Sequence, residues 1–299
     1  MAKFAKDVDT KAVASRQAAN VMKQLQGKEI SSVGTVRNYE SSLSKVAEYA
    51  NRELNCGLKE ITPEQAYQYL TDRSVEVGQK TLDMERQAIQ SMMHHVSNKL
   101  STDATLNVIK SESQQILTSR SYTQEQISMV ASSQNERNSL STKIAHTAGL
   151  RAHELLTIQR IDERKPDERP ALESKFSQRD GLRYTVEGKG GLVREIQIPQ
   201  YLSERLEQYR LETPKVIVDR GINYLTRYDI AGGKNWSNSF SAASNRTLNW
   251  SGGGHGLRHS YAQERMNELQ KHMTRELALE VVSQEMGHFR PDITEVYLR

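Results

Sequence analysis

Apolar residues recur at helical spacing through the first hundred residues of the chain. Residues 11–26 carry such a stripe on one face, and a second stripe begins near residue 34. Thr62 is a typical N-cap, because Pro63 and an acidic residue follow it, and a further stripe runs over residues 79–99. The pattern predicts that this part of the chain is entirely helical.

A polar stretch interrupts the periodic pattern over residues 100–121. It is rich in Ser, Thr and Gln and has no apolar stripe, which is typical of a connecting segment. We therefore predict a helical N-terminal domain over residues 1–110, a linker over 111–121 and a C-terminal domain over 122–299.

One region of the C-terminal half has the period-two pattern of strands. Residues 183–187 and 193–198 alternate apolar and polar positions on either side of a Gly-Lys-Gly-Gly turn. This predicts a β-hairpin with Lys189 at its tip, and Pro199 ends its second strand. We expect a fold that is mainly α with a small β-sheet, in which the C-terminal domain is mixed α/β.

The other segments of the C-terminal half are predicted to be helical or irregular. Thr123 is the expected N-cap of the first helix of that half. Arg151 is expected at the start of a later helix. Further helices are expected over 139–148, 203–212, from 256 onward and over 274–286, and a Gly-, Ser- and Asn-rich loop is expected over 231–254.

Composition narrows the class of protein without deciding its function. The chain has 299 residues, enough for two domains, with 26% charged residues and a mean hydropathy of -0.71. No stretch approaches the ~18 apolar residues of a membrane span, and the N-terminus lacks a secretory apolar run. The single cysteine, Cys56, favours a reducing, cytoplasmic location. A net charge of +4 permits nucleic-acid binding through local patches but does not require it.

Candidate chemistry is concentrated in three segments of the C-terminal half. Residues 148–155 and 255–262 each contain an arginine with histidine beside it, and Met286-Gly287-His288 precedes Tyr297 by nine residues. Arginine forks bind phosphate oxygens, imidazoles move protons, and a phenol oxygen can attack phosphorus. The segments contain no acidic cluster for a metal, so the predicted chemistry on a phosphodiester proceeds without one.

Each segment taken alone also has an ordinary explanation. Arg151 and Glu154 can form an exposed ion pair of the kind common in helices. His255, His259 and His288 could form a zinc site, but no cysteine or spaced carboxylate completes it. The glycines at 252–254 lack the lysine and preceding strand of a phosphate-binding loop. It is the occurrence of all the segments together that favours the phosphodiester chemistry.

In order and spacing, these segments resemble the tyrosine recombinases, also called the phage-integrase family. That family carries a box GLRxxEL, a later box HxLRHxxA, and (L/M)GH with a tyrosine nine residues on. This chain reads GLRAHEL from Gly149, HGLRHSYA from His255, and MGH ending at His288, with Tyr297 following. The family also has a β-turn lysine between the first two boxes, often in GKGxKxR, and this chain reads GKGGLVR from Gly188.

The resemblance implies the chemistry of the central groups. Tyr297 would attack the scissile phosphate, releasing a 5′-hydroxyl and leaving a 3′-phosphotyrosyl bond. Arg151 and Arg258 would hold the two non-bridging oxygens and stabilise the charge of the pentacoordinate transition state.

Proton transfer and support are implied for the other matching residues. Lys189 would protonate the departing 5′-oxygen, and His255 would take the proton of the tyrosine and return it in the reverse step. His288 would add a hydrogen bond to a phosphate oxygen. Glu154 and His259 would orient these groups.

The resemblance also implies the architecture and the partners. Thr35-Val36-Arg37-Asn38-Tyr39 is similar to the start of the family's helical, SAM-like core-binding domain, and only about thirty residues precede it, which favours a two-domain, Xer-like layout. Such a protein would form a C-shaped clamp on a double-stranded recombination site with an inverted-repeat core. It would act as a homotetramer through a Holliday junction, need no cofactor, and bind DNA less tightly as salt rises. Accessory DNA-bending or directionality factors, and a nucleoid-associated location in a bacterium or phage, would fit an integrase of a mobile genetic element.

Two other functions stay open from the sequence. A type IB topoisomerase-like enzyme uses the same residue types as a monomer to relax DNA, and a DNA-binding regulator could keep the fold without catalysis. Family members usually continue past the tyrosine into a tail that docks on a neighbouring protomer, whereas this sequence reads only Leu298-Arg299 after it. Contacts between protomers would then come from a removed tail or from elsewhere in the chain.

Overall fold

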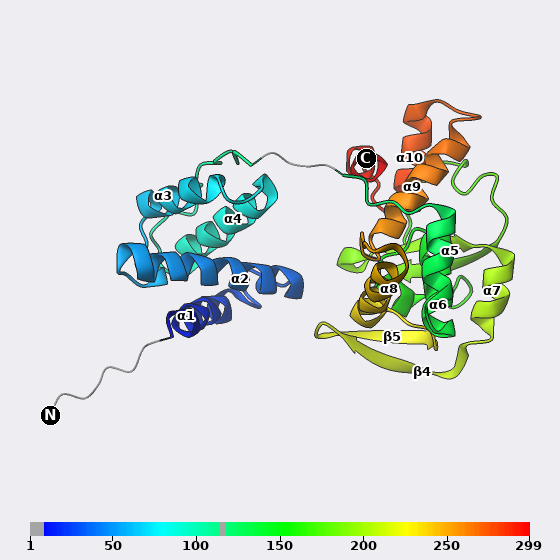
Figure 1. Cartoon of the computed structure of the whole chain (residues 1–299), viewed down its shortest axis with the longest axis horizontal. Helices are drawn as coiled ribbons and strands as arrows, with labels where there is room; N and C mark the ends of the chain where they lie inside the picture. Colours follow the sequence, from blue (N-terminus) through cyan, green and yellow to red (C-terminus); the bar gives the residue numbers. More distant parts are fainter. Residues whose placement is uncertain (1–8, 114–117) are drawn as a thin grey trace. The chain divides into compact units, whose positions relative to one another are not determined.

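The computed structural model describes residues 9–113 and 118–299, which form two compact units (Figure 1). The division between the units falls between Ile116 and Leu117. Residues 114–117 of the predicted linker lie outside the described residues. The domain boundaries at 110 and 122 therefore stay predictions, and each unit is described by itself.

The N-terminal unit is helical in its described part, as the apolar pattern predicts. Thr62 caps its helix in a capping box with Gln65. The helix predicted over 79–99 ends four residues early, because the chain turns through a left-handed backbone at Asn98 (φ 53°). The elements are α1 (Thr10–Leu25), α2 (Val33–Tyr49), a π-helical turn (Ala50–Leu54), a 3-10 turn (Leu58–Glu60), α3 (Pro63–Ser74) and α4 (Gln79–His95).

The first residues of the predicted linker are held on the N-terminal unit. The Ser111 amide donates to Gln79 Oε1 at 2.8 Å, and its hydroxyl donates to the carbonyl of Val77 at 2.7 Å. On the other side of the undescribed residues, the amide of Tyr122 donates to Ser260 Oγ at 2.7 Å within the C-terminal unit. The described ends of the linker are thus tied to the units that they join.

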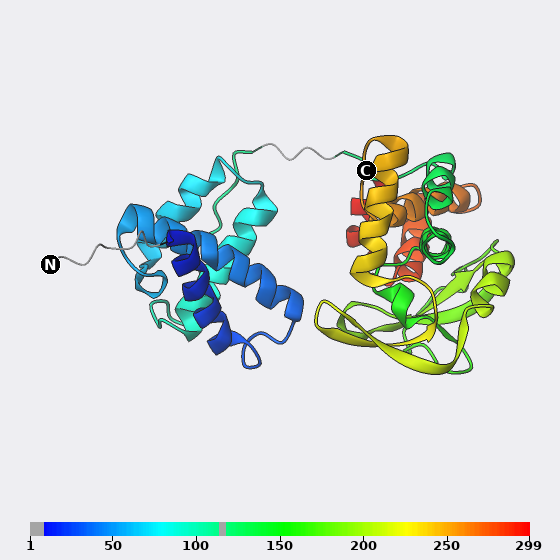
Figure 2. The ribbon, with the colours of Figure 1, turned by 60° about the horizontal axis from the view of Figure 1, so that its bottom comes forward.

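The C-terminal unit packs helices around a hydrophobic core that includes Trp236, Phe240 and Leu257, all fully buried (Figure 2). Thr123 caps its first helix, as expected. The α-helices are α5 (Gln124–Ser132), α6 (Glu136–Thr147), α7 (Gln200–Glu207), α8 (Gly233–Leu248), α9 (Gly256–Leu269), α10 (Arg275–Glu285) and α11 (Pro291–Glu295), with 3-10 turns at Glu154–Thr157, Lys189–Gly191 and Val296–Leu298.

Two antiparallel sheets complete the C-terminal unit. The predicted hairpin is confirmed: β2 (Leu182–Glu187) pairs with β3 (Val193–Ile198), and the short β1 (Gln159–Arg160) adds to the other edge of β2. A second sheet, which the sequence reading missed, pairs β4 (Arg210–Asp219) with β5 (Ile222–Tyr228).

Two predictions for the segments after β3 are wrong. The helix expected over 203–212 ends at Glu207, because the chain enters β4 at Arg210. The loop expected over 231–254 is mostly the helix α8, whose Trp236, Phe240 and Ala243 face the core at helical spacing. Its polar residues lie largely on the other face, so composition alone suggested a loop. Among the described residues, no helix is long and apolar enough to cross a membrane.

Candidate active site

The aromatic ring of Tyr297 lies among the histidines that the sequence singled out. Its ring centroid is 5.3 Å from that of His255, 4.8 Å from that of His259 and 5.1 Å from that of His288. The guanidinium carbon of Arg258 lies 5.5 Å from the same centroid. Three separate parts of the chain, the start of α9, the turn after α10 and the last 3-10 turn, therefore meet at one place.

The second arginine box is fixed by hydrogen bonds that define a histidine tautomer. Arg258 is fully buried and donates to the carbonyls of Gly149 and Met286. It also donates to Nε2 of His288 at 2.9 Å, so this nitrogen accepts. The other ring nitrogen, Nδ1, therefore carries the proton, and it donates to Thr294 Oγ1 at 2.9 Å. His288 is thus neutral in this arrangement.

The carboxylate of Glu154 joins the two arginine boxes. Its Oε1 accepts from Arg151 Nη1 at 2.7 Å, and its Oε2 accepts from the Arg151 amide at 2.7 Å. The same Oε2 accepts from Arg194 at 2.8 Å and lies 3.9 Å from Arg258 Nη1. Burial alone would raise the pKa of this carboxyl, but Arg194, Arg258 and Arg151 outweigh it and hold the pKa well below its usual range.

The electrostatics of the site favour neutral histidines and charged arginines at neutral pH. Burial and the neighbouring Arg258 lower the pKa of His288 to about 3 and that of His255 to about 4. Burial lowers the pKa of His259 as well. Burial and the charge of Arg151 lower the pKa of Arg258 to about 10, which still leaves a cation at pH 7. A neutral His255 beside Tyr297 can accept a proton.

Lys189 lies in the exposed turn of the β2–β3 hairpin, as predicted. The turn lies against the first arginine box, since a Cβ built on Gly188 would be 3.3 Å from Glu154 Oε1 and 3.9 Å from Arg151 Nη1. The lysine is thus one residue away from a backbone position that contacts the Arg151–Glu154 pair.

The expectation that Arg151 starts a helix is wrong. Arg151 lies in a turn that leaves α6 through Gly149, whose φ is +60° and whose Cα faces the ring of Tyr261. The 3-10 turn begins only at Glu154. The left-handed backbone of Gly149 turns the chain away from a helix, and only glycine fits there because a Cβ would lie 2.8 Å from Tyr261 Cδ1.

A buried arginine of the site was not assigned a role from the sequence. Arg194 is 2% exposed and contacts Glu154, although in the sequence it stands only as the last residue of the hairpin motif GKGGLVR. The signal was present: Arg194 shares its face of β3 with Ile196 and Ile198, two residues apart each, and a charge on a buried face needs a partner.

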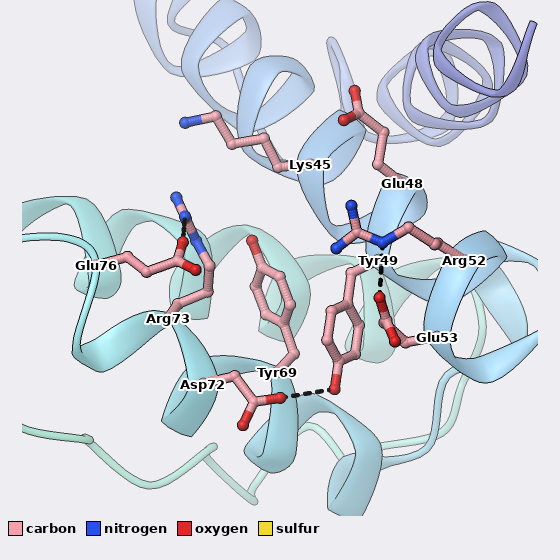
Figure 3. Close-up of a pocket in the computed structure, with 9 residues that line it drawn as sticks. All are labelled: Lys45, Glu48, Tyr49, Arg52, Glu53, Tyr69, Asp72, Arg73 and Glu76. Carbon is pink, nitrogen blue, oxygen red and sulfur yellow. Dashed lines mark hydrogen bonds and ion pairs between the residues drawn. The ribbon is translucent and has the colours of Figure 1, made fainter.

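A cavity of about 590 Å³ lies in the N-terminal unit and carries none of these groups (Figure 3). Tyr49 donates to Asp72 Oδ2 at 2.9 Å, and Arg73 pairs with Glu76. Next to it, the carboxylate of Glu85, 1% exposed, accepts from the hydroxyl of Tyr69 at 2.9 Å. The predicted catalytic residues all belong to the C-terminal unit, so this cavity is not the centre of the predicted chemistry.

Gly287→Ala is expected to destabilise the C-terminal unit more than a matched glycine substitution does. Gly287 has φ +72°, and a Cβ there would lie 2.4 Å from Cδ of the buried Arg194. Gly190 has φ +81° but open space around its Cβ position, so Gly190→Ala measures the backbone cost alone, about 1–2 kcal/mol. Chemical denaturation should show an additional loss of about 1–3 kcal/mol for Gly287→Ala. Equal losses in the two variants would contradict this packing.

Stability should fall as the pH is lowered through the histidine range. The pKa of His288 is about 3 in the folded protein, against about 6.5 unfolded, so the unfolded state binds more protons between these values and stability rises with pH there. His288→Gln should flatten the pH dependence of the unfolding free energy between about pH 7 and 5, by up to about 1 kcal/mol per pH unit. His272→Gln, at an exposed position after α9, is the control. If His288→Gln left the slope of the unfolding free energy against pH unchanged, His288 would not have a lowered pKa in the folded protein.

Comparisons with known proteins show the fold of the chain. No family model and no curated protein match the sequence. Among solved structures, the XerH site-specific recombinase bound to its difH substrate matches with 16% identity over 99% of this chain and 95% of that one, at a TM-score of 0.55. The Tn1549 transposon integrase with a circular intermediate DNA matches with 14% identity over 96% and 95%, at 0.54.

A lambda integrase dimer bound to a COC′ core site matches with 16% identity, over 95% of this chain and 94% of that one, at a TM-score of 0.59. At identities this low, the likeness shows the fold. The chain has the fold of the tyrosine recombinases, mainly α with small antiparallel sheets, which confirms the predicted fold class.

Proposed function

We propose that this protein is a site-specific tyrosine recombinase, which cuts and rejoins duplex DNA through a 3′-phosphotyrosyl intermediate. The observation that carries the proposal is the meeting of Tyr297 with Arg258 and neutral histidines, next to the Arg151–Glu154 pair. A nucleophile, two phosphate-binding cations and a proton acceptor are the groups that such a transfer needs. The XerH recombinase structure is bound to its difH substrate, and a lambda integrase tetramer is bound to a Holliday junction, which supports the same function here.

Residues of the chain can supply and accept every proton that the proposed cleavage step transfers. Tyr297 Oη attacks phosphorus as its proton passes to His255, and the bond from phosphorus to the 5′-oxygen breaks. Lys189 donates a proton to that oxygen, so a 5′-hydroxyl leaves. Attack by a 5′-hydroxyl of another strand reverses the step and rejoins the DNA. The transferred phosphodiester keeps its bond energy, so no ATP is consumed.

The charges of the two arginines and the protonation state of His255 support the proposed roles of these three residues. Arg258 and Arg151 carry positive charge to the place where the non-bridging oxygens would lie. Burial, together with the same charges, lowers the pKa of His255 and keeps it neutral before DNA binds. A phosphate placed between them would offset that effect and raise the imidazole pKa, which helps His255 receive the proton during attack.

Arg258 is fully buried in the present arrangement, and the ring of Tyr297 packs beside its guanidinium. A phosphate can therefore reach Arg258 only after part of its surroundings moves, and the ring of Tyr297 is one such part. Tyr297 lies in the last turn of the chain and follows a backbone with positive φ at Gly287 and Phe289. We propose that DNA binding moves this segment and brings the phenol in line with the phosphorus.

The proposed partners are double-stranded DNA with an inverted-repeat core and three further copies of the chain. Accessory DNA-bending or directionality factors belong to the same proposal. The proposal also assigns roles to the other residues of the site. Glu154 and His259 are supports, and the catalytic groups besides Tyr297 are Arg151, Lys189, His255, Arg258 and His288.

The proposal is tested by locating covalent cleavage and then supplying two copies of the cleaved site. Purified protein is incubated with DNA fragments from the flanks of its own locus, and covalent adducts are mapped to the nucleotide. A plasmid with two mapped sites should then give deletion or inversion products. Relaxed circles alone would indicate a type IB topoisomerase-like enzyme, and binding without adducts would indicate a catalytically silent regulator.

A further inference from the structure

Arg194 connects the separate segments that carry the predicted catalytic groups. From β3, its Nη2 donates to Glu154 Oε2 at 2.8 Å and to the carbonyl of Gly149 at 3.5 Å. Its Nη1 donates to the carbonyl of Glu285 at 2.7 Å, at the end of α10. The first contact holds the partner of Arg151, and the last holds the residue that precedes the turn to His288.

The contacts of Arg194 meet those of Arg258 at two points. The carbonyl of Gly149 accepts from both guanidinium groups, and Glu154 Oε2 accepts from Arg194 and lies 3.9 Å from Arg258 Nη1. Each of the two arginines therefore connects the turn after α6 to the end of α10 through its hydrogen bonds. The guanidinium of Arg258 lies beside the ring of Tyr297, whereas both Nη groups of Arg194 donate to acceptors of the protein itself.

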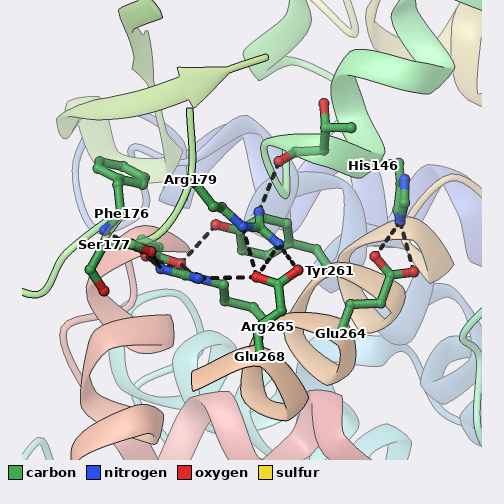
Figure 4. A network of polar contacts seen from close by, with 10 residues as sticks. His146, Phe176, Ser177, Arg179, Tyr261, Glu264, Arg265 and Glu268 are labelled. Carbon is green, nitrogen blue, oxygen red and sulfur yellow. Dashed lines mark hydrogen bonds and ion pairs between the residues drawn. The ribbon is translucent and has the colours of Figure 1, made fainter. Parts of the chain in front are cut away.

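A second polar network holds the far end of Arg194 in place. The carboxylate of Glu285, 1% exposed, accepts from the hydroxyl of Tyr261 at 2.8 Å and from Arg265 at 3.0 Å. Arg265 also donates to Glu268 and to the carbonyl of Ser177, as Figure 4 shows. Glu285 thus anchors α9 through its side chain and Arg194 through its carbonyl.

We propose that Arg194 is a positioning residue, which keeps Arg151, Arg258 and His288 in register to hold the scissile phosphate. The expected slowing of DNA cleavage rests on the proposed function, whereas the expected displacement of His288 does not. A guanidinium can donate to three acceptors from one plane, whereas an ammonium at the end of a flexible stem cannot reproduce that fork. Loss of the fork would shift the phosphate-holding groups without removing any of them.

Arg194→Lys is the variant that tests the positioning role. At saturating duplex DNA with a mapped cleavage site, and at a temperature where circular dichroism shows the variant folded, single-turnover adduct formation should slow about 100-fold. The DNA concentration at half-saturation should change by less than about 3-fold, because phosphate contacts elsewhere supply the binding. Arg205→Gln on α7, which loses one positive charge far from this network, should leave both quantities unchanged.

A modified DNA substrate distinguishes the positioning role of Arg194 from an indirect effect on Lys189 in the β2–β3 turn. In DNA with a bridging 5′-sulfur, the leaving thiolate needs no proton, so Lys189→Ala should recover most of its rate. Arg194→Lys should keep its deficit on that DNA. Recovery by Arg194→Lys would mean that Arg194 acts through the β2–β3 turn, and would overturn the proposal.

A measurement without DNA keeps the inference independent of catalysis. In the ring ¹⁵N spectrum, His288 should show a protonated Nδ1 and an accepting Nε2, and Arg194→Lys should shift both resonances. If wild type forms no adduct, the proposed function fails, yet this spectrum still decides the positioning role. Unshifted His288 resonances in Arg194→Lys would overturn it, and Arg194→Gln, which keeps one amide donor, repeats the test if the lysine variant does not fold.

Discussion

Tyr297→Phe is expected to abolish covalent protein–DNA adducts and to leave DNA binding within a few fold. The substitution removes only the phenol oxygen, the atom that would bond to phosphorus. The ring stays, and with it the contacts to Arg258 and to the three histidines. Adducts are measured by denaturing electrophoresis after incubation with labelled duplex, and binding by fluorescence anisotropy on the same duplex.

The matched control for this variant is Tyr201→Phe, since Tyr201 is 59% exposed on α7 and far in sequence from the boxes. It should form adducts at the wild-type rate. The unfolding free energies of both variants should lie within about 1 kcal/mol of wild type, so a lost adduct is not lost folding. Adducts that persist in Tyr297→Phe would mean that another residue is the nucleophile.

How far the sequence could predict the fold depends on which local signal was strongest. The hairpin at Lys189 was predictable, because alternation and a glycine turn agreed. Helix α8 was missed, because glycine, serine and asparagine outweighed the apolar positions 236, 240 and 243. The β4–β5 hairpin was missed although Val216, Ile217 and Val218 precede the Arg220-Gly221 turn, since these three residues form a continuous apolar run without the alternation of a half-buried strand.

The members of the candidate site could be predicted, but their burial could not. The order of the boxes indicated that Tyr297, Arg258 and His288 belong together, and the structure places them together. Burial is a tertiary property: no local pattern shows that Arg258 is fully covered. The partners of Arg194 are likewise set by chain segments 40 and 91 residues away, at Glu154 and Glu285.

The charges of the candidate site divide into a part that reaches the surface and a part that is enclosed by the protein. Arg151, with 23% of its side chain exposed, can meet a phosphate directly. Glu154 has no exposure and is surrounded by guanidinium groups, so its charge acts inside the protein. Loss of this carboxylate would therefore affect both stability and alignment.

Glu154→Gln is expected to lower the free energy of unfolding of the C-terminal unit by about 3–5 kcal/mol. The amide removes the negative charge between Arg151, Arg194 and Arg258, and leaves buried cations without compensation. Its NH₂ group also points a donor at groups that only donate. Chemical denaturation followed by circular dichroism measures the loss, and Glu276→Gln, at an exposed position of α10, should change the stability by less than about 0.5 kcal/mol.

The pH dependence gives this prediction a second, independent readout. Because the arginines hold the pKa of Glu154 well below its unfolded value of about 4.3, its contribution is complete above that value and is lost as the pH falls through the folded pKa. Wild type and Glu154→Gln should therefore differ most near neutral pH and converge below about pH 4. A constant difference over this range would show that the loss comes from packing of the amide, not from the charge of the carboxylate.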